Sequence, residues 1–157
     1  MTRLILIDYN KLMARLTKQD VEQKITDWFD RLEGLYKQID AWLEGLSDYS
    51  VERSHTFQRT EELMKKFAIK PKDVPTYKIK TKRGTISFFP TALWVIGADS
   101  KVDIHIDTTK EKKHLMLFDM RNGNGDESNW QVSGDDLKKL LLHFDKKVFT
   151  IIIKDIQ

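Results

Sequence analysis

The clearest pattern in the sequence is a broad apolar stripe in its first third. Between residues 25 and 46, three positions in each heptad are apolar through three consecutive heptads. This is the spacing of one face of an α-helix, and a stripe of that width is typical of a helix that packs against two neighbours. Thr17 and Asp20 can begin such a helix, and Gly45 can end it. We therefore predict one long helix here.

A second, shorter helix is predicted over residues 50–67. Its apolar side would consist of Val51, Phe57, Leu63, Met64 and Phe67. Two of the three prolines, Pro71 and Pro75, follow soon after and disfavour helix in the residues before them. Residues 1–69 are therefore expected to form an antiparallel helical hairpin.

Beyond this linker, apolar residues mostly alternate with polar ones, which is the period of a β-strand. Strands are predicted at residues 77–81, 86–88, 93–96, 102–106, 115–118 and 130–132. A helix is predicted to begin at Ser133–Asp136, and residues 148–153 predict a last strand, with a continued helix as the alternative. The whole is an α+β fold: an N-terminal helical hairpin region, 1–69, followed by a β-rich α+β domain, 70–157, with a mostly antiparallel β-sheet and one C-terminal helix.

Composition narrows the class of protein. Of the 157 residues, 40% are hydrophobic and 32% charged, as in a globular protein. Cysteine is absent, which excludes disulfides, zinc–thiolate sites and thiol nucleophiles and favours a reducing compartment. No apolar run reaches the roughly 18 to 20 residues of a membrane span, and the N-terminus lacks the apolar core of a signal peptide. We expect a cytoplasmic protein with no membrane partner.

The excess positive charge lies in the middle of the chain. Residues 70–113 carry 10 basic and 5 acidic side chains, against a net charge of +3 for the whole protein. Strand alternation would place Lys78, Lys80 and Lys82 about 6.6 to 7 Å apart on the face opposite Tyr77, where with Arg83 they could follow the phosphate backbone of a nucleic acid. The alternative is an edge strand whose lysines discourage aggregation.

Acidic and histidine side chains offer a second possible chemistry. Asp103, His105 and Asp107 would lie on one face of a strand and could bind a divalent ion, although a solvated sheet face explains the same alternation. We assign neither a metal nor a cofactor.

An acid followed by Glu111 and Lys113 resembles the acid and Glu-x-Lys arrangement of restriction-endonuclease-like nucleases. The resemblance implies a metal-dependent nuclease that would use Asp103, Asp107, Glu111 and Lys113, with magnesium held by the carboxylates. In that family the Glu-x-Lys lies within a strand, whereas here it is expected in a turn. No catalytic residue is therefore assigned, and we do not expect an enzyme.

The leading hypothesis follows from the helix stripe. The second predicted helix has too few apolar positions to cover it, and an uncovered apolar face requires a partner. We expect an interaction or assembly protein that binds itself or a larger protein, with the basic hairpin as a nucleic-acid-binding alternative. The partner-binding residues would be Ile25, Trp28, Phe29, Leu32, Leu35, Tyr36, Ile39, Trp42 and Leu43.

Overall fold

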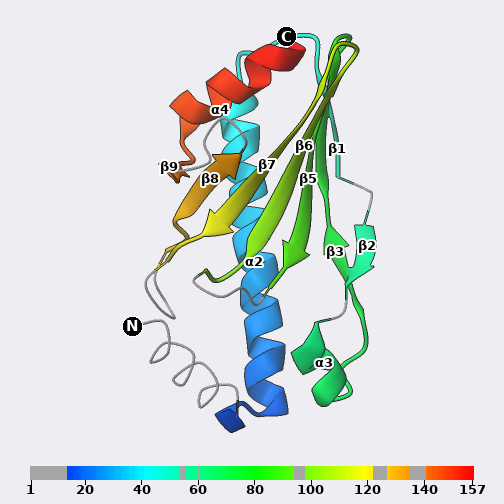
Figure 1. Ribbon diagram of the computed structural model, residues 1–157, viewed down its shortest axis with the longest axis vertical. Helices are drawn as coiled ribbons and strands as arrows, with labels where there is room; N and C mark the ends of the chain where they lie inside the picture. Colours follow the sequence, from blue (N-terminus) through cyan, green and yellow to red (C-terminus); the bar gives the residue numbers. More distant parts are fainter. Residues whose placement is uncertain (1–13, 54–55, 60, 94–97, 122–126, 135–140) are drawn as a thin grey trace.

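A long helix lies along one face of a seven-stranded antiparallel sheet (Figure 1). The computed structural model of the protein describes residues 14–53, 56–59, 61–93, 98–121, 127–134 and 141–157. Its helices are α2 (Lys18–Leu43), α3 (Glu62–Lys66), α4 (Lys146–Ile153) and the short 3-10 turn η2 (Lys154–Ile156). Its strands are β1 (Ser50–Glu52), β2 (Thr56–Arg59), β3 (Lys72–Pro75), β4 (Tyr77–Lys80), β5 (Gly84–Ala92), β6 (Lys101–Thr108), β7 (Lys112–Asp119), β8 (Trp130–Gly134) and β9 (Leu142–His143).

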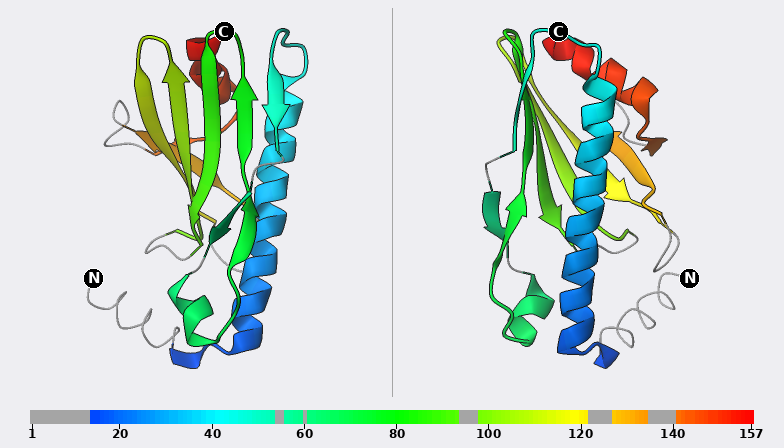
Figure 2. Two further views of the ribbon diagram at one scale, coloured as in Figure 1. Left: turned by 90° about the vertical axis from the view of Figure 1, so that its right-hand side faces the viewer. Right: turned by 180° about the vertical axis from the view of Figure 1, so that it is seen from behind.

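The strand order of the large sheet is β1-β4-β5-β6-β7-β8-β9, and β2 pairs with β3 in a separate two-stranded ribbon. Neighbouring strands from β4 to β9 follow one another in the chain, so the sheet is a meander to which β1 adds one edge. Helices α2 and α4 lie on the same side of it, as the side and rear views show (Figure 2). The opposite side faces solvent over β6 and β7, where His105, Asp107 and His114 are exposed.

The predicted long helix is confirmed, and its start has the expected chemistry. Thr17 Oγ1 accepts from the Asp20 backbone N–H at 3.2 Å, and Asp20 accepts from the Thr17 N–H at 2.8 Å. This capping box satisfies two amides that the first turn leaves free. The hydrogen bond from the Thr17 backbone and then that from its side chain lower the pKa of Asp20. After Leu43 the chain turns at Gly45, whose φ of +87° favours glycine.

The predicted helical hairpin is wrong. In place of one helix over 50–67, the chain forms β1, β2 and the five-residue helix α3. Val51 pairs with Ile79 of β4 at the edge of the large sheet. The apolar positions of this segment are few and scattered, so no helical face was strong enough to compete with pairing against β4 and β3.

The predicted last strand is also wrong, because residues 146–153 form α4. Asp145 caps it by accepting from the Val148 N–H at 2.9 Å. Phe149, Ile152 and Ile153 are buried while Ile151 is 62% exposed, which is helical spacing. The predicted strand at 93–96 and the start of the predicted helix at 133–136 fall largely on residues outside the described part; Leu93 is buried, and Leu142–His143 belong to β9.

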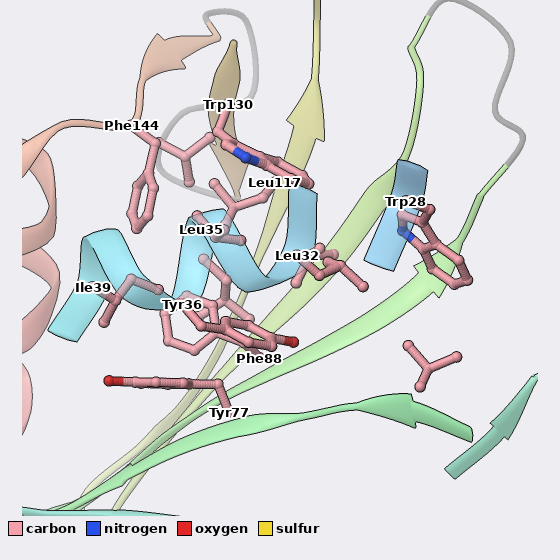
Figure 3. Close-up of a cluster of buried hydrophobic side chains, with 14 of the residues drawn as sticks. Trp28, Leu32, Leu35, Tyr36, Ile39, Tyr77, Phe88, Leu117, Trp130 and Phe144 are labelled. Atoms are coloured by element: carbon pink, nitrogen blue, oxygen red, sulfur yellow. The ribbon is translucent and has the colours of Figure 1, made fainter. Parts of the chain in front are cut away.

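The core lies between α2 and the sheet. Tyr36 of α2 stacks on Tyr77 of β4 with ring centroids 5.1 Å apart, and Phe88 of β5 meets Tyr77 edge-on (Figure 3). The Tyr36 hydroxyl donates to the Pro75 carbonyl at 2.7 Å, and the Tyr77 hydroxyl donates to Asp40. Burial is the main reason why the pKa values of both tyrosines lie far above their usual range. Each buried ring therefore keeps its polar atom satisfied.

Candidate functional site

The residues predicted to bind a partner lie in the core of the protein itself. Seven of the nine are buried: Ile25, Trp28, Leu32, Leu35, Tyr36, Ile39 and Leu43. Phe29 and Trp42 are partly buried and pack against the same core. Trp42 contacts Phe144 and Phe149, with ring centroids 5.3 and 5.5 Å apart. The sheet and α4 thus cover a stripe that the sequence alone leaves unpartnered.

The exposed large apolar side chains lie elsewhere. Among the described residues they are Phe89, Leu141, Leu142 and Ile151, and α2 contributes none of them. The physical reason for expecting a partner at the helix is therefore absent from the described part of the chain.

The basic residues of the predicted nucleic-acid site divide into two groups. Lys78 and Lys80 lie on β4 on the face opposite the buried Tyr77 and Ile79, as the alternation predicts. Lys80 forms an ion pair with Glu52 of β1 at 2.5 Å. Lys82 and Arg83 are exposed in the turn between β4 and β5.

The structure does not bring all four nuclease-like residues together. Lys113 pairs in register with the buried Ile106, while Asp107 pairs with Lys112, so Lys113 and Asp107 leave opposite faces of the hairpin. Lys113 contacts Glu111 and Asp155, each at 3.3 Å. Hydrogen bonds to Glu111 and then to Asp155 raise the pKa of Lys113, which holds it as a charged ion-pair partner.

The strongest convergence of chemistry joins Asp103, His105 and His114 on the open face of the sheet. His105 of β6 lies directly opposite His114 of β7, and Asp103 lies two residues before His105 on the same face. One ligand atom from each of the three side chains lies within 4.8 Å of the other two. The imidazole rings stack with centroids 4.9 Å apart, and His114 Nε2 lies 3.2 Å from Asp103 Oδ1.

The surroundings of this cluster leave it accessible on one side. Phe89 of β5 meets the His105 ring edge-on with centroids 5.5 Å apart, and Lys101 Nζ lies 3.4 Å from Asp103 Oδ1. Both histidines are exposed, whereas the Asp103 side chain is only 15% exposed. The carboxylate is therefore the most enclosed of the three groups, and the two imidazoles are open to solvent.

The sequence pattern placed two members of this cluster on one face of a strand, and the structure confirms that placement. It grouped Asp103 and His105 but chose Asp107 as the third member, and it missed His114. Asp107 instead lies 3.9 Å from Lys112. The pairing of His114 with His105 follows from the length of the turn. The Thr108 N–H and hydroxyl donate to the Glu111 carbonyl, and the Thr108 hydroxyl accepts from the Glu111 N–H, so the loop between the strands is only Thr109-Lys110. A two-residue loop fixes every cross-strand pair of the hairpin, including His105 with His114.

These three ligands suit a particular group of metals. Two imidazole nitrogens and one carboxylate oxygen are a common zinc set, and three protein ligands leave a fourth position open. Mixed nitrogen and oxygen ligands favour zinc, cobalt, nickel or copper over magnesium or calcium. In a tetrahedral zinc site the ligand atoms lie about 3.3 Å apart, so separations up to 4.8 Å need only small rotations of the side chains.

A partly buried cluster of ion pairs lies at the other end of β6 and β7. Asp119 is fully buried, accepts from Arg31 of α2, and accepts from the Asn129 N–H at 2.8 Å. Arg121 donates to Asp99 and, at 2.8 Å, to Asp27. With Lys24, which lies 3.3 Å from Asp99, the cluster has three acidic and three basic side chains, so we assign it to holding α2 on the sheet rather than to chemistry.

Comparisons with protein-family models, with curated proteins and with solved structures found no match for this chain. Among the described residues, no helix combines the length and the apolar character needed to cross a membrane. The side chains of the chain itself are therefore the basis for assigning a function.

Proposed function

We propose that the protein binds a divalent transition-metal ion of the zinc class through Asp103, His105 and His114. The observation that carries this is the convergence of their three ligand atoms from adjacent strands within 4.8 Å. Two imidazoles and a carboxylate make a set with an open fourth position, to which water or a ligand from another molecule can bind.

An ordinary ion pair between His114 and Asp103 is the competing explanation. Asp103 Oδ1 is buried, and among the described residues no donor is aligned to hydrogen-bond with it. Lys101 Nζ and His114 Nε2 approach this oxygen, but at 3.4 and 3.2 Å and without that alignment. The Lys101 ammonium already places positive charge beside this oxygen, so the proposal rests on the convergence of the three ligand atoms and not on a missing partner.

The proposal does not extend to partner binding through α2, since the apolar stripe of that helix is enclosed by the sheet and α4. It does not include catalysis either. Asp103 and Asp107 of the nuclease-like pattern lie on the opposite face of the β6–β7 hairpin from Lys113.

A cobalt and zinc titration of untagged protein tests the proposal. Tetrahedral coordination gives Co²⁺ visible absorption bands, which disappear when zinc displaces the cobalt. Calorimetry gives the stoichiometry and the affinity. We expect one site per chain and no saturable binding of Mg²⁺, because the ligand set is too rich in nitrogen for magnesium.

Single-ligand variants sharpen the test. His114→Gln and His105→Gln should each weaken binding more than tenfold, since even outer-sphere changes weaken metal sites by about 10 to 100-fold. His143→Gln is the matched control, because His143 is an exposed histidine that contacts Asn129 at 3.2 Å outside the cluster. Equal losses in all three variants, or no saturable binding of zinc by the parent protein, would refute the proposal.

A further inference from the structure

A depression lies where the β4–β5 and β6–β7 hairpins end side by side. Its volume is about 440 Å³, and its lining includes Lys80, Lys82, Arg83, Thr109 and Asp107. We propose that it binds a phosphate group of an anionic ligand, independently of the metal site. The strand spacing of the lysines favours the backbone of a nucleic acid as the source of that phosphate.

The backbone that forms the depression is tightly held. A Cβ added to Gly84 would lie 2.3 Å from the Asp107 carbonyl oxygen, so only glycine lets the two hairpins approach so closely. The Thr81 hydroxyl donates to the Ile156 carbonyl, which ties the first turn to η2. It also accepts from the Arg83 N–H at 3.1 Å. Lys82 and Arg83 therefore project from a fixed turn, which reduces the entropic cost when a ligand binds.

The charges at this end of the molecule are unbalanced. Lys80 is paired with Glu52, and Asp107 lies within 3.9 Å of Lys112. Among the described residues, no carboxylate lies within ion-pair distance of Lys82 or Arg83. Two cations thus remain uncompensated beside the depression, and a ligand that brings negative charge would neutralise them.

The donors present suit phosphate better than a carboxylate. A guanidinium can give two parallel hydrogen bonds to phosphate oxygens, and lysine adds a point charge. The hydroxyls of Thr85 and Thr109 line the same depression and can donate to further oxygens. Phosphate has enough acceptor oxygens to use all of these donors together.

Lys78 extends the basic surface away from the depression. It shares a face of β4 with Lys80 and lies about 6.6 to 7 Å from it along the strand. Successive phosphates of an extended single strand have a comparable spacing, so a strand anchored at Arg83 could follow β4. Free phosphate or a nucleotide would fill the depression without reaching Lys78.

Fluorescence anisotropy with a labelled 20-nucleotide single strand tests this inference. Buffer containing EDTA removes any contribution from a metal at Asp103, His105 and His114, so failure of the metal proposal leaves this result intact. We expect the variant Lys82→Gln with Arg83→Gln to bind at least tenfold more weakly. The log–log slope of its affinity against salt should be shallower by about 1.4, because each phosphate of a single strand that a cation neutralises contributes about 0.7 to that slope.

The matched control removes two charges from elsewhere. Lys18→Gln with Lys37→Gln changes two exposed lysines of α2 and should bind within about twofold of the parent. Competition by inorganic phosphate or a mononucleotide as strong per phosphate as by the oligonucleotide would support the site and assign it to a small ligand. Equal weakening in both double variants, or no binding by the parent at 50 mM salt, would overturn it.

Discussion

Gly84 shows how a single residue sets the shape of one end of the molecule. Its lack of a side chain lets β5 lie against the Asp107 carbonyl of β6. Replacing it with alanine should lower the free energy of unfolding by about 1 to 3 kcal/mol, because the backbone must move to relieve the clash. Urea unfolding followed by circular dichroism measures this change.

The control for this prediction is Gly34→Ala, since a Cβ at Gly34 meets nothing within 4 Å. Gly34 lies inside α2, where alanine has the higher helix propensity by about 0.8 to 1 kcal/mol. The two substitutions should therefore change stability in opposite directions. A gain in stability for Gly84→Ala would show that the two hairpins are less closely packed than the structure indicates.

At the same scale, the sequence predicts which face a residue occupies better than what it contacts. Alternation places Asp103 and His105 on one face, as the structure confirms. The contact between Arg31 and Asp119 joins positions 88 residues apart. No local pattern predicts it, because a long-range ion pair depends on how the helix is placed over the sheet.

Among the elements, α2 and the β4–β5 and β6–β7 hairpins could be predicted from the sequence, whereas the segments on either side of the predicted strands could not. A wide apolar stripe that begins at a capping residue fits a helix and little else. From Tyr77 to Phe88, apolar and polar residues alternate on both sides of a turn, which is the pattern of a hairpin. Residues 50–67 and 148–153 have apolar patterns that fit more than one element. Their structure is decided by the neighbours they pair with or pack against.

Helix α4 makes a prediction that separates the two elements considered for residues 148–153. In a strand, Ile151 and Ile153 would share a face, but in the helix Ile151 is 62% exposed and Ile153 is 2% exposed. Ile153→Ala should therefore destabilise the protein by about 2 to 5 kcal/mol and Ile151→Ala by less than about 0.5 kcal/mol. Equal effects in urea unfolding would instead support the strand.

For the whole molecule, one core connects the two regions that the sequence divides near residue 70. Buried residues of α2, the sheet and α4 belong to a single cluster. The sequence alone could not show whether the apolar stripe of α2 needs a partner, because whether a sheet covers an apolar helix is a property of the assembled fold. The covering sheet then leaves its own second face open, and the proposed metal ligands lie there.

The ion pairs that join α2 to the sheet predict how stability depends on pH. Burial alone would raise the pKa of Asp99, but hydrogen bonds and charge from Arg121 and Lys24 outweigh it and lower that pKa. Its folded pKa thus lies below the unfolded value of about 3.9, so this stabilisation is complete above that pH and is lost as the pH falls through the folded pKa.

Asp99→Asn removes this contribution and supplies the test. At pH 7 the variant should be less stable than the parent, because Arg121 and Lys24 lose a carboxylate that lies 3.3 Å from Lys24 Nζ. As the pH falls through the folded pKa, the carboxylate of the parent also loses its charge, and the two proteins should converge in their free energy of unfolding. A difference that stays constant from pH 7 to pH 2 in urea unfolding would contradict the lowered pKa, and would assign the role of Asp99 to its shape rather than to its charge.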